Sequence, residues 1–387
     1  MLAIPYKQRL TYMPFVLLLV FLISCTSEVP DSTSTTAVPA ADTLREFKLV
    51  VDANELLLDS PVFMKMDPST GHLFLYDNGP KTIFELDKES KVINRFGGSG
   101  GGPGELSKIT GLYVSDSFLY AHDPQEFFIH RYNRENGEVT TYNYGQRTTD
   151  LDAPPTMGTI ITNHHPSNSR TVTLDGNILR PSHEEGEYLY ELIDWEGNHL
   201  ADIAPLPESY QADLETEAYR QVLENGEVPA TDLHRVFPVA DRANPNEIFL
   251  VYSANPKIEK YDMSGNKLWE VGVPPTPEMD TLRMDHLGFV QAMRFTRQIP
   301  MRKYAWGTSG PDGALFLATY TNLSLPVTMR TLWVHRFGAD GELTHRFALP
   351  NSEETILLPF IAVDTETGRI LTVSMASGEI RAYPFEL

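Results

Sequence analysis

Cysteine, basic residues and long apolar runs are scarce in this sequence of 387 residues. Cys25 is the only cysteine, so the chain can form no internal disulfide. Lysine and arginine number 31 against 52 aspartate and glutamate residues, which gives a formal net charge of −21. A surface this acidic repels phosphate backbones, so nucleic acid is not an expected partner. The apolar run at residues 15–23 would span about 14 Å as a helix, too short to cross a bilayer.

The amino-terminal segment has the layout of an export signal. Lys7 and Arg9 precede the apolar run, and residues 1–24 contain no acid. The run ends in Leu-Ile-Ser-Cys25, which resembles a bacterial lipobox, where apolar and small residues precede the cysteine that receives the lipid. We expect residues 1–24 to be a lipoprotein signal peptide and Cys25 to be lipidated, which places the protein in the cell envelope, on the outer membrane. The alternative is a secretory signal that happens to contain a cysteine.

From residue 44 onward the same arrangement of strands recurs six times. Each copy has an apolar strand, a turn with Asp, Asn or Gly, and a strand that often ends in an aromatic residue. Four-stranded repeats of this kind are typical of a β-propeller. Apolar residues are consecutive in the second strands, as in Leu-Phe-Leu-Tyr at residues 73–76, which indicates sheets covered on both faces. The sequence therefore predicts an all-β, six-bladed propeller over residues 44–387, with seven blades as the alternative.

The two ends of the repeat region complement each other. The sixth copy has no outermost strand of its own, and residues 45–51 form a strand that belongs to no copy. We expect this strand to pair beside the last one, because that would close the ring and remove an exposed edge. Residues 25–43 are rich in Ser, Thr, Pro and Ala, so we expect the lipidated cysteine to be followed by a flexible tether.

Two long inserts interrupt the repeats and carry helical patterns. Residues 205–232 have apolar side chains at helical spacing, with Asn225-Gly226 as a stop signal. Residues 274–303 have a looser helical stripe that Gly288 interrupts. The sequence predicts one short helical insert at each place.

The link between the first two copies carries a glycine-rich motif. Its end reads Gly-Pro-Gly-Glu-Leu106, and it resembles a stretch of six-bladed propeller lipoproteins of Bacteroidetes-type bacteria, relatives of the NHL and TolB-like propellers. The resemblance in blade order covers residues 44–387 and departs in its additional glycines and in Leu106, where an aromatic residue is common. It implies a propeller fold, and it implies no catalytic residues.

Motifs for catalysis and metal binding are weak. Gly-Gly-Ser99-Gly-Gly fits the bare pattern of a nucleophile elbow, but that chemistry needs a strand–turn–helix, and here the loop is expected between two strands. Lactonases on this fold place a metal-binding Glu early in the first inner strand, whereas residues 62–67 read Val-Phe-Met-Lys-Met-Asp. We therefore expect no cofactor, and a divalent metal belongs only to the enzyme alternative.

A basic and aromatic stretch lies in the second insert. Residues 286–311 contain no acid, although the average of 52 acids in 387 residues would give three or four. The candidate ligand-binding residues in this stretch are Arg294, Arg297, Arg302, Lys303, Tyr304 and Trp306. Two interpretations of these cations remain open. They pair with acidic neighbouring loops and only hold the insert in place, or they form a positive site on an acidic protein for an anionic ligand.

Three functions remain open at this point. The first is a lipid-anchored binding module for a partner protein or an extracellular ligand such as an acidic glycan, without enzymatic activity. The second is a metal-dependent hydrolase or lyase of the lactonase or NHL-lyase kind, and the third is a structural component of the envelope. In each of them the membrane is contacted only through the lipid.

Overall fold

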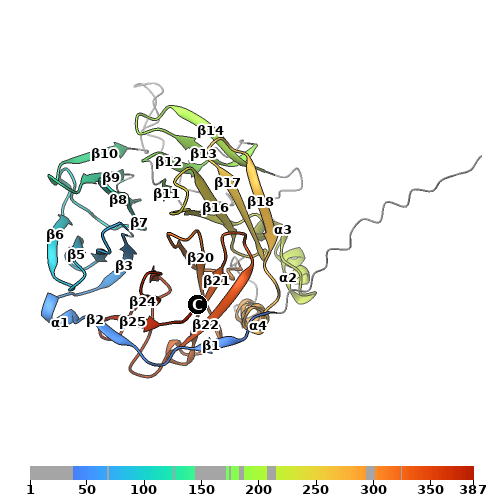
Figure 1. Cartoon of the computed structure of the whole chain (residues 1–387). Coiled ribbons are helices and arrows are strands. Elements are labelled where there is room, and N and C mark those ends of the chain that lie inside the picture. Colours follow the sequence, from blue (N-terminus) through green and yellow to red (C-terminus); the bar gives the residue numbers. More distant parts are fainter. Residues whose placement is uncertain are drawn as a thin grey trace, which may run out of the picture. The chain divides into compact units, whose positions relative to one another are not determined.

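Six small β-sheets stand around a central axis in the computed structural model (Figure 1). The structure describes residues 38–67, 69–124, 126, 128–143, 171–173, 176–182, 187–206, 215–292, 301–323 and 325–387. All of them belong to one compact unit, Val38–Leu387. The prediction of an all-β, six-bladed propeller is confirmed.

Blades 1 to 3 each consist of four consecutive antiparallel strands, with the first strand innermost. Blade 1 contains β3 (Pro61–Met66), β4 (Leu73–Asp77), β5 (Thr82–Leu86) and β6 (Val92–Gly97). Blade 2 contains β7 (Gly111–Val114), β8 (Phe118–Asp123), β9 (Phe128–Asn133) and β10 (Val139–Asn143). Blade 3 contains β11 (Thr171–Val172), β12 (Ile178–Pro181), β13 (Tyr188–Ile193) and β14 (His199–Pro205).

Blades 4 and 5 follow the same plan, and blade 6 takes three strands from the end of the chain. Blade 4 contains β15 (Val236–Ala240), β16 (Glu247–Tyr252), β17 (Lys257–Asp262) and β18 (Lys267–Gly272). Blade 5 contains β19 (Trp306–Ser309), β20 (Leu315–Tyr320), β21 (Thr331–Phe337) and β22 (Leu343–Pro350). Blade 6 contains β23 (Ala362–Asp364), β24 (Arg369–Val373) and β25 (Ile380–Pro384).

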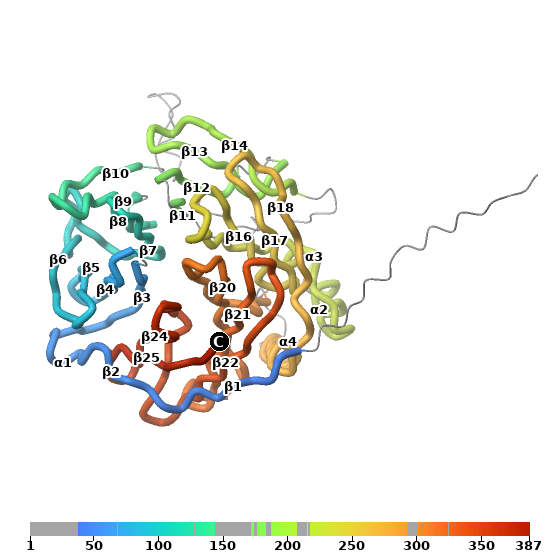
Figure 2. The backbone as a smooth tube through the Cα atoms, viewed as in Figure 1, coloured from blue at the N-terminus to red at the C-terminus, as the bar shows by residue number. Residues whose placement is uncertain are grey.

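The amino-terminal strand β2 (Lys48–Val51) closes the ring as the fourth strand of blade 6. It pairs antiparallel with β25, with Leu49 opposite Arg381, and the two strands lie side by side in Figures 1 and 2. The predicted closure is therefore confirmed. A further strand, β1 (Ala41–Thr43), pairs in parallel with β22 and adds a fifth strand to blade 5. The propeller unit thus begins six residues before the predicted boundary at residue 44, because β1 covers the outer edge of blade 5.

The hydrophobic core is divided among the interfaces between neighbouring blades. Six clusters of buried apolar residues each join two adjacent blades, including the pair that closes the ring, blade 6 and blade 1. All five residues of β4 are buried, as the consecutive apolar run predicts. Each blade is thus held by its neighbours on both faces.

The two predicted helical inserts are present. The first contains α2 (Thr216–Glu224) and α3 (Ala230–Leu233), and α2 stops before Asn225 as expected; the start of that pattern lies outside the described residues. The second contains α4 (Pro277–Ala292), which continues through Gly288 without the expected interruption. Buried Tyr219 and Leu223 of α2 pack against Val290 of α4, so the two inserts support each other. Two shorter helices are α1 (Ala53–Leu56) and the 3-10 turn η1 (Val327–Met329).

The glycine-rich link between β6 and β7, which contains Ser99, joins strand to strand as the sequence predicts. Gly97 and Gly98 adopt positive φ angles of 81° and 128°, which favour glycine. At Gly97 a Cβ would also lie 2.6 Å from the buried Leu106 side chain and 3.0 Å from the Lys81 carbonyl oxygen, so a larger residue is disfavoured there. The motif therefore serves to carry the backbone from the outer strand of blade 1 to the inner strand of blade 2.

The alternating strand direction within each blade places two kinds of loop on one side of the ring. Links between blades and loops between second and third strands leave from the same side, which we call the insert face. Both helical inserts, the glycine-rich link and the β20–β21 loop are of these kinds. The elaborate parts of the chain therefore share one face.

Candidate functional site

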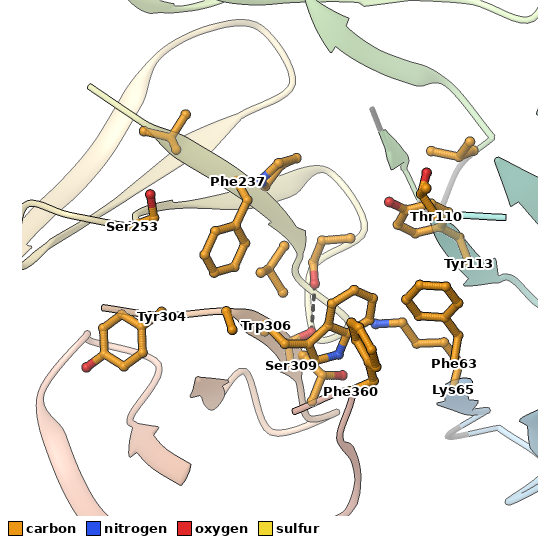
Figure 3. A pocket seen from close by; sticks show the side chains of 18 of the residues that line it. Phe63, Lys65, Thr110, Tyr113, Phe237, Ser253, Tyr304, Trp306, Ser309 and Phe360 are labelled. Atoms are coloured by element: carbon orange, nitrogen blue, oxygen red, sulfur yellow. Dashed lines mark hydrogen bonds between the residues drawn. The ribbon is translucent and has the colours of Figure 1, made fainter. Parts of the chain in front are cut away.

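The innermost strands of the blades surround a cavity on the ring axis (Figure 3). Its volume is about 340 Å³; the inner strands of blades 1 to 5 contribute to its wall, together with Phe360 in the link before β23. Phe63 and Lys65 come from β3, Tyr113 from β7, Phe237 from β15 and Trp306 from β19. Because side chains alternate along a strand, two or three residues of each inner strand can reach this space. The cavity is a natural place for a small ligand.

One part of the wall is an aromatic cluster of Phe63, Trp306 and Phe360. The ring centroids of Phe63 and Phe360 are 4.6 Å apart, and those of Trp306 and Phe360 are 5.1 Å apart at an interplanar angle of 89°. The Trp306 indole Nε1 donates to the Ile361 carbonyl at 3.3 Å, which fixes the ring. The cluster offers a rigid apolar surface to a ligand.

The charged side chains of the cavity wall are all cationic in the part of the chain that the structure describes. They are Lys65, Arg235, Arg242 and Arg302, and no Asp or Glu accompanies them. Arg235 is neutralised by Asp232, whose Oδ1 lies 3.0 Å from its Nε. This wall contrasts with the formal net charge of −21 of the whole chain. The cavity is therefore a local positive field inside an acidic protein.

Lys65 and Arg242 lie deepest in this field. Burial and, to a smaller extent, the neighbouring Arg242 charge lower the pKa of Lys65 to about 7. Burial also lowers the pKa of Arg242 to about 10, while the Asp67 carboxylate acts in the opposite direction. Arg242 donates one hydrogen bond to the Met66 carbonyl, so its remaining donors are available to an acceptor in the cavity. An anion entering the cavity would relieve the unfavourable burial of both cations.

The structure describes four of the six predicted ligand-binding residues, and three of these line the cavity. Arg302, Tyr304 and Trp306 line the cavity, whereas Lys303 does not. Arg294, Arg297 and Cys25 lie outside the described residues. Part of the predicted basic and aromatic stretch therefore lies at the cavity.

Tyr304 contributes its ring to the cavity and turns its hydroxyl away from it (Figure 3). The hydroxyl lies 2.9 Å from His335 Nδ1, and His335 Nε2 lies 2.8 Å from the Glu278 carboxylate. Burial lowers the pKa of His335, so the ring is neutral at pH 7 and the network assigns its proton to Nε2. Glu278 also binds Arg346, with Nε at 2.7 Å. This network joins α4 to blade 5 and holds Tyr304 in place.

The sequence prediction missed Lys65 and Arg242. Lys65 carried a usable signal, because a lysine within the apolar run Val-Phe-Met-Lys-Met of an inner strand is unusual unless it faces a polar space. Arg242 follows β15 in a turn and carried no such signal.

A second hollow of about 700 Å³ lies against the other side of Arg242 and Val114. Its wall is more acidic and includes Asp116, Asp194 and Glu196. The Arg131 guanidinium lies 4.5 Å from the centroid of the Trp195 ring, so one face of that aromatic residue is already covered. The two hollows thus differ in charge, with Arg242 at the boundary between them.

The described residues contain no group of three or more His, Cys, Asp or Glu side chains placed to hold a metal ion. None of the helices in that part of the chain combines the length and apolar character needed to span a bilayer.

Solved structures with low sequence identity to this chain share its propeller fold. No protein-family model and no curated protein matches the sequence. A protein of Bacteroides fragilis described as exported superposes with a TM-score of 0.50 at 9% identity, covering 89% of this chain and 98% of its own. A member of the DUF4221 family from Bacteroides vulgatus superposes with a TM-score of 0.51 at 10% identity, covering 90% and 97%. At these identities the similarity shows a shared propeller fold alone.

Proposed function

We propose that the protein is an extracytoplasmic binding protein whose central cavity takes an anionic small molecule with an apolar part. The observation that carries this proposal is the cavity wall, which has four cations and no acid among its described residues. Carboxylates bind arginine through charge-assisted hydrogen bonds, and the aromatic cluster of Phe63, Trp306 and Phe360 suits an apolar substituent.

The location follows from the amino-terminal sequence. A positive segment, a short apolar run and the lipobox-like Leu-Ile-Ser-Cys25 support export followed by lipidation at Cys25. We propose that the propeller is held at the outer membrane by this lipid, with residues 26–37 as the tether.

The enzyme alternative is less well supported by the cavity. A divalent cation needs carboxylate or imidazole ligands, and the described wall residues include neither. The Arg242 cation would also repel such an ion. Binding of an anion is the simpler use of these side chains.

Calorimetric titration with 3-phenylpropionate and with its uncharged amide tests the proposal. Both probes carry the same aromatic part, so only the charge differs. A charge-assisted hydrogen bond contributes about 1.5–3 kcal/mol, which predicts a preference of at least about tenfold for the carboxylate. Arg242→Gln should abolish this preference, whereas Arg45→Gln, which removes an exposed arginine far from the cavity wall, should preserve it. Equal binding of the two probes by the wild-type protein would refute the proposal.

A further inference from the structure

Lys65 occupies an unusual position for a lysine. It lies between the buried residues Met64 and Met66 in β3, and strand alternation places it on the same side as Phe63, toward the cavity. Its Nζ lies 5.2 Å from the centroid of the Trp306 ring (Figure 3). The amine is thus held over an aromatic surface at the centre of the ring of blades.

No acid neutralises this amine among the residues that the structure describes. Two other lysines that lie over aromatic rings differ in this respect. Lys257 lies over Tyr252 and is 2.9 Å from Glu259, and Lys260 is 2.7 Å from Asp241. For Lys65 the neighbouring charge is the cation Arg242, which favours the neutral amine. With a pKa of about 7, a large fraction of Lys65 is unprotonated at neutral pH.

We propose that Lys65 captures the carbonyl carbon of a 2-oxo acid with an apolar substituent and forms a reversible imine with it. A lysine that is desolvated in an apolar site or lies next to another cation is an activated nucleophile for carbonyl groups. The inference rests on the proposed function, because it names the ligand class of the same cavity.

The cavity has a partner for each part of such a molecule. The carbonyl carbon meets Lys65, and the adjacent carboxylate meets the free donors of Arg242. The apolar substituent packs on the aromatic cluster of Phe63, Trp306 and Phe360. A volume of about 340 Å³ is at the small end of ligand pockets and suits a molecule with one aromatic ring.

The reaction needs no other reactant. The neutral amine of Lys65 attacks the carbonyl carbon, and one amine proton passes to the carbonyl oxygen to give a carbinolamine. The carbinolamine then loses its oxygen as water together with the second amine proton, and a carbon–nitrogen double bond remains. Water adds back in the reverse step and releases the 2-oxo acid unchanged.

Reductive trapping with phenylpyruvate and sodium cyanoborohydride tests the inference on the purified protein. Reduction of the imine leaves a stable adduct on the lysine. It increases the mass of the protein by the mass of the 2-oxo acid less one oxygen atom. We expect one adduct for each chain, mapped by peptide mass spectrometry to Lys65, and its competitive suppression by 3-phenylpropionate.

Two variants sharpen the test. Lys65→Arg keeps the positive charge and removes the nucleophile, so it should abolish trapping. Lys257→Arg is the matched control, because Lys257 also lies over an aromatic ring but is paired with Glu259, and trapping should be unchanged.

The mapping on the wild-type protein keeps the test decisive even if Lys65→Arg does not fold. An adduct on other lysines, or no adduct while 3-phenylpropionate binds in the cavity, overturns the imine and leaves the proposed function standing. If 3-phenylpropionate does not bind either, the proposed function fails as well.

Discussion

Replacing Glu278 with glutamine should destabilise the propeller strongly, although this residue lies in an insert and not in a blade. Glu278 is the second residue of α4, and its side chain is 1% exposed. It accepts hydrogen bonds from His335 at 2.8 Å and from Arg346 at 2.7 Å. Arg346 in turn donates to the Pro39 carbonyl at 2.8 Å, so one carboxylate connects α4, blade 5 and the amino-terminal segment.

The size of the effect follows from the pKa of this carboxylate. Burial acts to raise it, but hydrogen bonds from His335 and Arg346 outweigh burial and lower it from 4.5 to about 2. A shift of this size corresponds to about 3 kcal/mol of unfolding free energy. Removing one partner of a buried ion pair costs about 3–5 kcal/mol, which agrees with this value. Because His335 is neutral at pH 7, Arg346 is the full charge that Glu278→Gln would leave unpaired.

The pH dependence has a definite sign. The pKa of Glu278 is lower in the folded state than in the unfolded state, so its contribution is fully present above about pH 4.5 and is lost as the pH falls toward about 2. The difference between wild type and Glu278→Gln should therefore be largest at neutral pH and should shrink in acid.

Urea unfolding monitored by tryptophan fluorescence, at neutral pH and at about pH 3, measures this difference. Glu217→Gln is the control: Glu217 pairs with Arg220 on the exposed surface of α2, and its pKa is also lowered to about 2. Exposed ion pairs contribute little to stability, so the control should unfold nearly like the wild type. If Glu278→Gln unfolds like the control at neutral pH, the network does not stabilise the protein and the reasoning is refuted.

Two further predictions concern the ends of the chain. Deleting residues 44–51 removes β2 and exposes the edge of β25, so we expect light scattering from aggregation and loss of the cooperative thermal transition; a truncated protein that melts like the parent would contradict the closure. Cys25→Ala should move the protein from the membrane fraction to the soluble fraction, and identical fractionation of the two forms would rule out the lipid anchor.

The proximity of the residues that line the cavity could not be predicted from the sequence. Lys65 and Arg242 stand far apart in the chain, yet Arg242 donates a hydrogen bond to the carbonyl of Met66, 176 positions away. Nothing local relates these residues, because their proximity depends on which inner strands face each other across the axis. Tyr304 combines both cases: its place in a basic and aromatic stretch indicated a residue at a ligand site, and its ring does line the cavity, but only the fold shows that its hydroxyl is bound to buried His335.

The blades, by contrast, were determined by the sequence itself. Strand pattern and turn residues act over a few positions, so six repeats, covered sheet faces and the closing role of residues 45–51 could be predicted from local information. The tertiary structure decided which side chains share the axial cavity and which charges lack a partner there. Those properties depend on the ring geometry, which brings the inner strands of five blades and the link before the sixth to one small volume.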